Sequence, residues 1–186
     1  STQRLLRGQP GTGGGGGGSY GPTNTGRGNG GSGVVAVRYQ IGNITATAKA
    51  TGGNVLYFNT PTFGKVIHSF ISSGTFDLPA ANGPLAVDYV VCGGGGSGGA
   101  VSEVPNHGGG GGGAGGYRTG TTTIAPGTHS WLVGAGGAAS RTTESPGGET
   151  RLVASPTVTI AVLGGGNGGG NPAPTNKGAD SSDTPT

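Results

Sequence analysis

Short runs of β-branched and aromatic residues recur along the chain, separated by glycine tracts. In the run 65–71, Val66, His68 and Phe70 fall on one face, with the two-residue period of a strand. No window as long as a helix carries the 3.6-residue helical period. The predicted strands span 34–41, 54–58, 65–71, 75–78, 85–91, 117–124, 128–133, 151–154 and 157–163. The pattern therefore predicts an all-β chain with glycine-rich connections.

Two pairs of these runs are joined by proline-containing turns. The runs 117–124 and 128–133 flank Ala125-Pro126-Gly127, in which Pro-Gly favours a tight reversal. The runs 151–154 and 157–163 flank a second proline, Pro156. Each pair is predicted to form a β-hairpin. Trp131, within the first pair, is expected in the core.

The glycine tracts are the other repeated feature. Tracts 13–18, 93–96 and 108–113 are uninterrupted, and 164–170 is broken only by Asn167. Such a tract is either a flexible linker or a polyproline II helix, whose N–H and C=O groups all point outward and can bond to neighbouring tracts. Because tracts and strands adjoin directly at 33–34, 91–93 and 163–164, we expect ordered polyglycine tracts packed at one end of a β-domain, with polyglycine II as their candidate conformation.

The composition raises the question of what would stabilise a folded form of this chain. The chain has 48 glycines in 186 residues, and only 9% of its residues are charged, against about 25% in an ordinary domain. Ordering each glycine costs about 0.5–1 kcal/mol more than ordering alanine. A folded form therefore needs dense backbone hydrogen bonding or burial between chains, and both favour an oligomer.

Charge and hydropathy restrict the classes of partner that we expect for this chain. The net charge is +3, but the basic residues are scattered, whereas a nucleic-acid binder normally shows a clustered basic face. No apolar stretch is long enough to cross a bilayer. We expect neither nucleic-acid binding nor membrane insertion.

An internal repeat suggests a larger array. Segments 13–26 and 165–178, which start 152 residues apart (165 minus 13), share the motif Pro-Thr-Asn-x-Gly. We interpret the chain as a fragment of a tandem array. Residues 1–42 would be the C-terminal part of a preceding glycine-rich unit, 43–63 a connecting segment, and 64–186 a glycine-rich β-domain that is incomplete at its C-terminal end.

Motifs that would indicate catalysis are weak. Gly93-x-Gly95-x-x-Gly98 follows a strand and fits the dinucleotide fingerprint, but neither a helix nor an acidic residue about 20 positions on accompanies it. The lone cysteine, Cys92, reads as a small buried hydrophobe at a strand end. Seven acidic residues offer no pair suited to acid–base chemistry.

The three histidines, His68, His107 and His129, lack the short spacing of metal ligands. His68 and His129 fall in predicted strands and are expected to be structural. The sequence thus predicts a protein that is not an enzyme, with no catalytic residue, cofactor or metal site.

The order and spacing of several segments resemble a known family. Segments 70–79, 87–96, 115–118, 125–128 and 133–137 are similar to the glycine-rich domain of phage tail fibres and related surface proteins. Segment 31–39 resembles the closing strand of that domain. The resemblance implies a β-sandwich-like domain near a fibre tip or along its shaft. In some related phage adhesins, loops that connect stacked polyglycine II tracts touch the host receptor. This chain departs from the pattern by inserting 100–107, an expected exposed loop.

The expected function follows from that resemblance. The chain would be a structural or receptor-binding part of a phage tail fibre or appendage, located on the virion tail or extracellularly. Its partners would be copies of itself, as a trimer, another homo-oligomer or a filament, other tail proteins, and a host-surface glycan or protein. The alternative is a self-assembling extracellular filament or surface adhesin subunit. Candidate receptor contacts are Tyr20, Asn24, Arg27, Asn106, His107, Tyr117 and Arg141.

Overall fold

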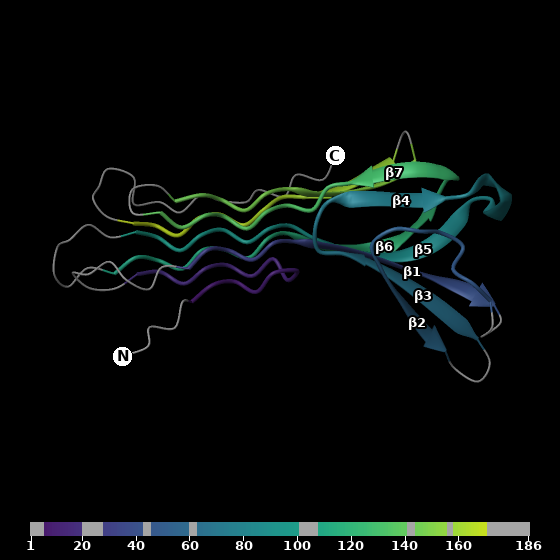
Figure 1. Cartoon of the computed structure of the whole chain (residues 1–186). Coiled ribbons are helices and arrows are strands. Elements are labelled where there is room, and N and C mark those ends of the chain that lie inside the picture. The colour runs from purple at the N-terminus through teal and green to yellow at the C-terminus, as the bar shows by residue number, and fades with distance from the viewer. Residues whose placement is uncertain are drawn as a thin grey trace.

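The computed structural model describes residues 6–19, 28–42, 46–59, 63–100, 108–140, 144–155 and 158–170. In this part of the chain, β-strands form one end of the molecule, and extended glycine tracts run side by side away from them (Figure 1). A short 3-10 helix, Ala80–Asn82, joins two of the strands. The strands are β1 (Val34–Gly42), β2 (Asn54–Asn59), β3 (Gly64–Phe70), β4 (Gly74–Leu78), β5 (Leu85–Cys92), β6 (Tyr117–Ile124), β7 (Gly127–Trp131), β8 (Thr150–Ser155) and β9 (Val158–Val162).

The first layer is a five-stranded antiparallel sheet in the order β2-β3-β1-β5-β6. Alternate residues of its three inner strands, β3, β1 and β5, are buried, as the two-residue period requires. In β3 the buried residues include Val66, His68 and Phe70, which confirms the predicted face. Each predicted strand is present, with ends shifted by at most two residues.

The second layer consists of the pairs β4-β7 and β8-β9, linked by a bridge between Leu132 and Arg151. Trp131 is the centre of the core between the layers. Its ring stacks on that of Phe76, with 4.6 Å between the ring centroids. It meets the ring of Phe70 edge-on, with 4.9 Å between the centroids. Its indole N–H donates to the carbonyl of Val153 at 2.9 Å. The predicted core position of Trp131 is confirmed.

One of the two predicted hairpins is wrong. β6 pairs with β5, and β7 pairs with β4, so the chain crosses from one layer to the other at Ala125-Pro126-Gly127. Gly127 has φ of 135°, and the N–H of Ala125 donates to the carbonyl of Ala154 in β8. The chain does reverse its direction at Pro126-Gly127. The partners of β6 and β7, however, are determined by contacts in the core and not by the turn. The β8–β9 hairpin is confirmed, with Leu152 opposite Ile160.

Residues from both sides of the predicted unit boundaries share this sheet. β1, from the segment 1–42, lies between β3 and β5 of the segment 64–186. The proposed division concerns a longer array and stays a prediction, as does assembly into an oligomeric fibre.

Candidate functional site

The glycine tracts alternate in direction. Tracts 13–19, 93–100, 133–140 and 163–170 run away from the sheets, the last three directly after β5, β7 and β9. Tracts 28–33, 108–116 and 144–149 return, and lead directly into β1, β6 and β8. The strand–tract junctions seen in the sequence are therefore the base of a bundle (Figure 1).

Tract 93–100 is the centre of this bundle. Its N–H groups donate in three directions in turn: Gly93, Gly96 and Gly99 to 108–116, residues 94 and 97 to 144–149, and residues 95 and 98 to 28–33. This repeat of three is that of a polyproline II helix, here in its glycine form. The prediction of ordered tracts is confirmed.

The other three tracts donate to the centre. Tracts 13–19, 133–140 and 163–170 all bond to carbonyls of 93–100. Six tracts thus surround one, and each also bonds to the neighbour on either side, which closes the ring. Segment 6–9 lies outside the ring, where it bonds to 13–19 and 28–33. Of the inserted segment 100–107, Ala100 is buried at the end of the central tract, so its predicted exposure is wrong, and 101–107 lies outside the described residues. The tracts on either side of the insertion are stacked, because Gly99 bonds to Gly110.

Close approach explains the glycines of the centre. A Cβ atom on Gly96 would run into the carbonyl oxygen of Gly166, although the φ of Gly96 is not positive. Ser97 and Ala100 are the buried residues of this tract that are not glycine. The Ser97 hydroxyl oxygen accepts from the N–H of Ser145 at 3.0 Å. The bundle interior is therefore held almost entirely by main-chain hydrogen bonds, a source of stability that the composition required.

Side chains of the ring point outward at a spacing of three. Asn29 and Ser32, Ala135 and Ala138, and Pro146 and Glu149 are each exposed or half-exposed. Non-glycine residues three apart within a tract indicate the outer face of a three-residue helix. This spacing is the signal in the sequence from which the outer face could have been predicted.

The far end of the bundle is where the connecting segments start and finish. Segments 20–27, 101–107 and 141–143 join tracts whose ends meet there, as the bonds from Ser19 to Gly99 and from Ala100 to the Glu144 carboxylate show. Six of the seven candidate receptor residues lie outside the described residues: Tyr20, Asn24, Arg27, Asn106, His107 and Arg141.

The seventh candidate, Tyr117, lies elsewhere. It begins β6 opposite Cys92, at the base of the bundle, and its side chain is 63% exposed. The structure thus separates Tyr117 from the segments at the far end. Its contact with a receptor stays a prediction.

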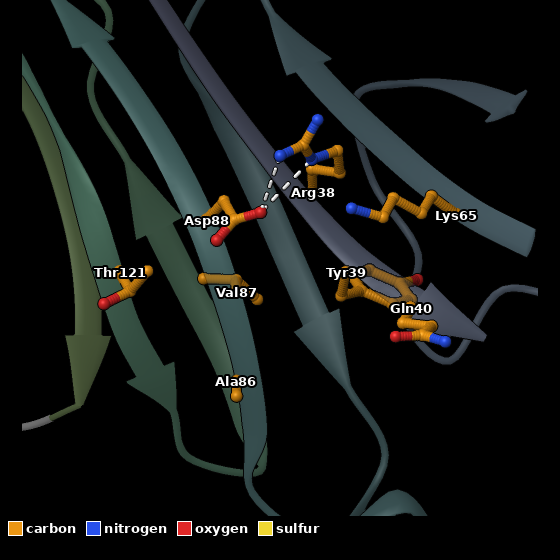
Figure 2. A pocket seen from close by; sticks show the side chains of 8 residues that line it. All are labelled: Arg38, Tyr39, Gln40, Lys65, Ala86, Val87, Asp88 and Thr121. Carbon is orange, nitrogen blue, oxygen red and sulfur yellow. Dashed lines mark hydrogen bonds and ion pairs between the residues drawn. The ribbon is translucent and has the colours of Figure 1, made fainter. Parts of the chain in front are cut away.

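A second surface lies on the outer face of the five-stranded sheet. A shallow depression of about 280 Å³ is lined by side chains that include Arg38, Lys65 and Thr121. Figure 2 shows Arg38 of β1 bonded to Asp88 of β5, with Lys65 on the neighbouring strand. The Arg38 and Asp88 side chains are 2.8 Å apart and form an ion pair, so Lys65 leaves the lining of this depression with a single net positive charge.

Two titratable groups are buried for structural reasons. The Nδ1–H of His68 donates to the carbonyl of Gly52 at 2.8 Å, and its Nε2 accepts from the Tyr39 hydroxyl at 3.0 Å. The Tyr39 oxygen in turn accepts from the N–H groups of Lys49 and Ala50. Burial lowers the pKa of His68 and raises that of Tyr39. His68 therefore ties the loop before β2 to the core as a neutral group.

The thiol of Cys92 is buried at the sheet end of the bundle. Burial raises the pKa of Cys92, which keeps it a protonated, weakly nucleophilic thiol. Its sulfur lies 3.4 Å from the carbonyl oxygen of Thr12. The prediction of a buried Cys92 at a strand end is confirmed.

Within the described ranges, no three His, Cys, Asp or Glu side chains are grouped as metal ligands. Among the same residues, no helix has the length and apolarity to span a bilayer.

A family described as "Glycine-rich domain" matches residues 71–185. That range includes six of the strands described above and the tracts from 93 onward. Neither the curated proteins nor the solved structures contain a match.

Proposed function

Because the chain belongs to the glycine-rich domain family, we propose that it is a structural or receptor-binding component of a phage tail fibre or tail appendage. The bundle acts as a stalk that holds connecting segments away from the sheets. The single observation that supports this role is the closed ring of tracts around 93–100. It fixes the ends of segments 20–27, 101–107 and 141–143 next to one another at the far end.

Attachment would work through avidity. A host-surface glycan or protein would bind weakly to polar side chains of these segments, Asn24, Asn106 and His107 among them. Several copies held on one tail would convert weak contacts into firm attachment, because each later contact is intramolecular. Other tail proteins would hold the copies, and the place of action would be the virion tail or the exterior of the cell.

The test is binding of the intact, labelled chain to bacterial cells, with competition against phage adsorption. In the decisive variant, residues 101–107 are replaced by a glycine–serine segment of equal length. The flanking tracts bond directly to one another, from Gly99 to Gly110 and from Gly96 to Gly113, so this variant should keep its melting temperature and lose cell binding. An equal replacement of Ala80–Asn82, at the opposite end, is the control and should bind normally.

A structural subunit of an extracellular filament or surface adhesin is the alternative role. This role predicts that neither replacement alters cell binding. It also predicts that the chain forms oligomers of steadily increasing mass with no fixed final size. Flanking genes separate the two roles further, because tail and baseplate genes accompany the first and secretion genes the second.

A further inference from the structure

β2 is an edge strand of the five-stranded sheet. One row of its N–H and C=O groups therefore faces away from β3. Among the described residues, none outside β3 makes a backbone hydrogen bond to it. Natural sheets usually protect such edges with charge, proline, a bulge or a covering segment. β2 has the sequence NVLYFN, which carries no charge and no proline, and its pairing with β3 is regular.

The side chains of β2 are also unusually apolar for an exposed edge. Leu56, Tyr57 and Phe58 are 53%, 54% and 58% exposed, respectively. They follow one another along the strand, so the apolar surface continues over both faces of the edge. An edge of this kind recruits another strand by main-chain hydrogen bonding, with side-chain contacts giving specificity.

The opposite edge of the same sheet provides a comparison. β6 carries Arg118 and several threonines, and just beyond its end the N–H of Ala125 bonds to Ala154 of β8. Among the residues that the structure describes, one edge of this sheet is thus protected and the other is bare. A contact made at only one edge joins two molecules and then stops.

We propose that β2 pairs antiparallel with β2 of a second copy, about a two-fold axis perpendicular to the sheet. The occupant is a second copy because β2 is uncharged, so identical strands meet without like-charge repulsion. Such an axis puts one residue opposite itself. With Tyr57 on the axis, Leu56 of each copy lies opposite Phe58 of the other, and with Leu56 on the axis, Val55 lies opposite Tyr57. Both registers pair apolar side chains on one face.

The chain's own terminal segments fit this edge less well. Segment 171–186 contains three prolines, two aspartates and one lysine, and proline cannot donate to a ladder. The bare edge is six residues long, or about 20 Å. An interface built on it falls below the roughly 1,200 Å² of stable complexes, so the pair should dissociate on dilution.

The contact joins the outer faces of two sheets. Leu56 lies in one cross-strand row with Ile67, Arg38, Asp88 and Thr121. Pairing at β2 extends this row into the second copy and makes a continuous ten-stranded surface (twice the five strands of one sheet). The inference does not depend on receptor binding, and its test uses the isolated chain.

Sedimentation velocity over about 5 to 500 µM, a range that spans weak association, should show a monomer that becomes a dimer. The double variant Leu56→Lys and Phe58→Lys should remain monomeric throughout. Thr121→Lys, on the same row at the opposite edge, is the matched control and should dimerise like the parent. A parent that stays monomeric or forms a trimer, or a double variant that dimerises like the control, would overturn the proposal.

Cysteine cross-linking covers the case in which the double variant does not fold. Residues opposite one another in an antiparallel pair have Cα atoms about 4.5–5.5 Å apart, within disulfide reach. Mild oxidation should cross-link either Leu56→Cys or Tyr57→Cys into dimers. The parent, whose Cys92 is buried, and Thr121→Cys should remain uncross-linked. Cross-linking at neither β2 position, or equally at position 121, refutes the contact.

Discussion

At the scale of single residues, glycine serves two purposes in the bundle that composition cannot separate. At Gly96, a Cβ would collide with the main chain of tract 163–170. At Gly111, on the outside of 108–116, the nearest atom to an added Cβ is the Gly16 oxygen, at 3.7 Å. Neither residue has positive φ. The difference between them is therefore one of packing alone.

Substitution by alanine should separate these two positions. Gly96→Ala is expected to destabilise the fold by about 3 kcal/mol or more, because the opposing group is main chain and overpacking can exceed the usual range. Gly111→Ala should be neutral or stabilising by up to about 1 kcal/mol, since alanine restricts the unfolded chain. Denaturant midpoints at constant m-value would measure both. Equal midpoints for the two variants would contradict the central placement of 93–100.

His68 makes stability depend on pH. Burial lowers its pKa in the folded state below the ordinary value of 6.5. Above pH about 6.5, His68 is neutral in the folded and the unfolded chain, and its full contribution to stability is present. As pH falls below 6.5, only the unfolded chain takes up this proton, so stability should fall by up to about 1.4 kcal/mol per pH unit until the folded-state pKa is reached.

The control for this effect is His68→Gln, which keeps polar atoms at the site but does not titrate. Unfolding free energies of both proteins at several values between pH 5 and 8 would isolate the His68 contribution. We expect the parent to lose more stability on acidification than the variant. Parallel curves would show that His68 titrates equally in both states.

At the scale of elements, the positions of the strands could be predicted from the sequence, but only some of the pairings between strands could. Runs such as Val34–Gly42 and Leu85–Cys92 combine β-branched residues with alternation, so local preference and burial agree. The β8–β9 pairing is also local, since two residues separate the strands. The pairings of β6 with β5 and β7 with β4 depend on which core face each strand fills. That choice is made by contacts far apart in sequence.

The crossing between layers depends on the backbone of Gly127. Its φ of 135° is one that side chains rarely adopt, and nothing lies within 4 Å of an added Cβ. Gly127→Ala should therefore cost about 1–3 kcal/mol through backbone strain alone. Thermal unfolding would measure the loss, and Ala125→Gly, two residues away, is a control for general loosening of the turn. A melting temperature for Gly127→Ala equal to that of the parent would show that the crossing tolerates other conformations.

At the scale of the whole molecule, the ring of tracts is a long-range structure. The sequence predicts that tracts pack together, because strands run directly into them. It does not indicate that 93–100 takes the centre, since a central and a peripheral tract have the same local composition. Most candidate receptor residues fall in segments outside the described residues. Tyr117 shares with them a position beside a tract, but residues beside a tract can lie at either end of it.

Hydrogen exchange should show the ring directly. The N–H groups of 93–99 all bond to neighbouring tracts, and the tract is buried. Their exchange should therefore approach the rate set by global unfolding. The N–H groups of Asn29 and Gly111 have no backbone partner among the described residues and should exchange orders of magnitude faster. Amide-resolved NMR would test this order, and similar rates for Gly96 and Gly111 would contradict a bundle with one central tract.

The lateral direction of the bundle's hydrogen bonds has a mechanical consequence. A pull on a connecting segment at the far end acts along the two antiparallel tracts that it joins. Those tracts are bonded sideways along their length, so they must slide past their neighbours, and the load is shared over many bonds at once. A hairpin pulled apart from one end instead loses its bonds one after another. The bundle therefore resists tension in shear, although little more than main chain holds it together.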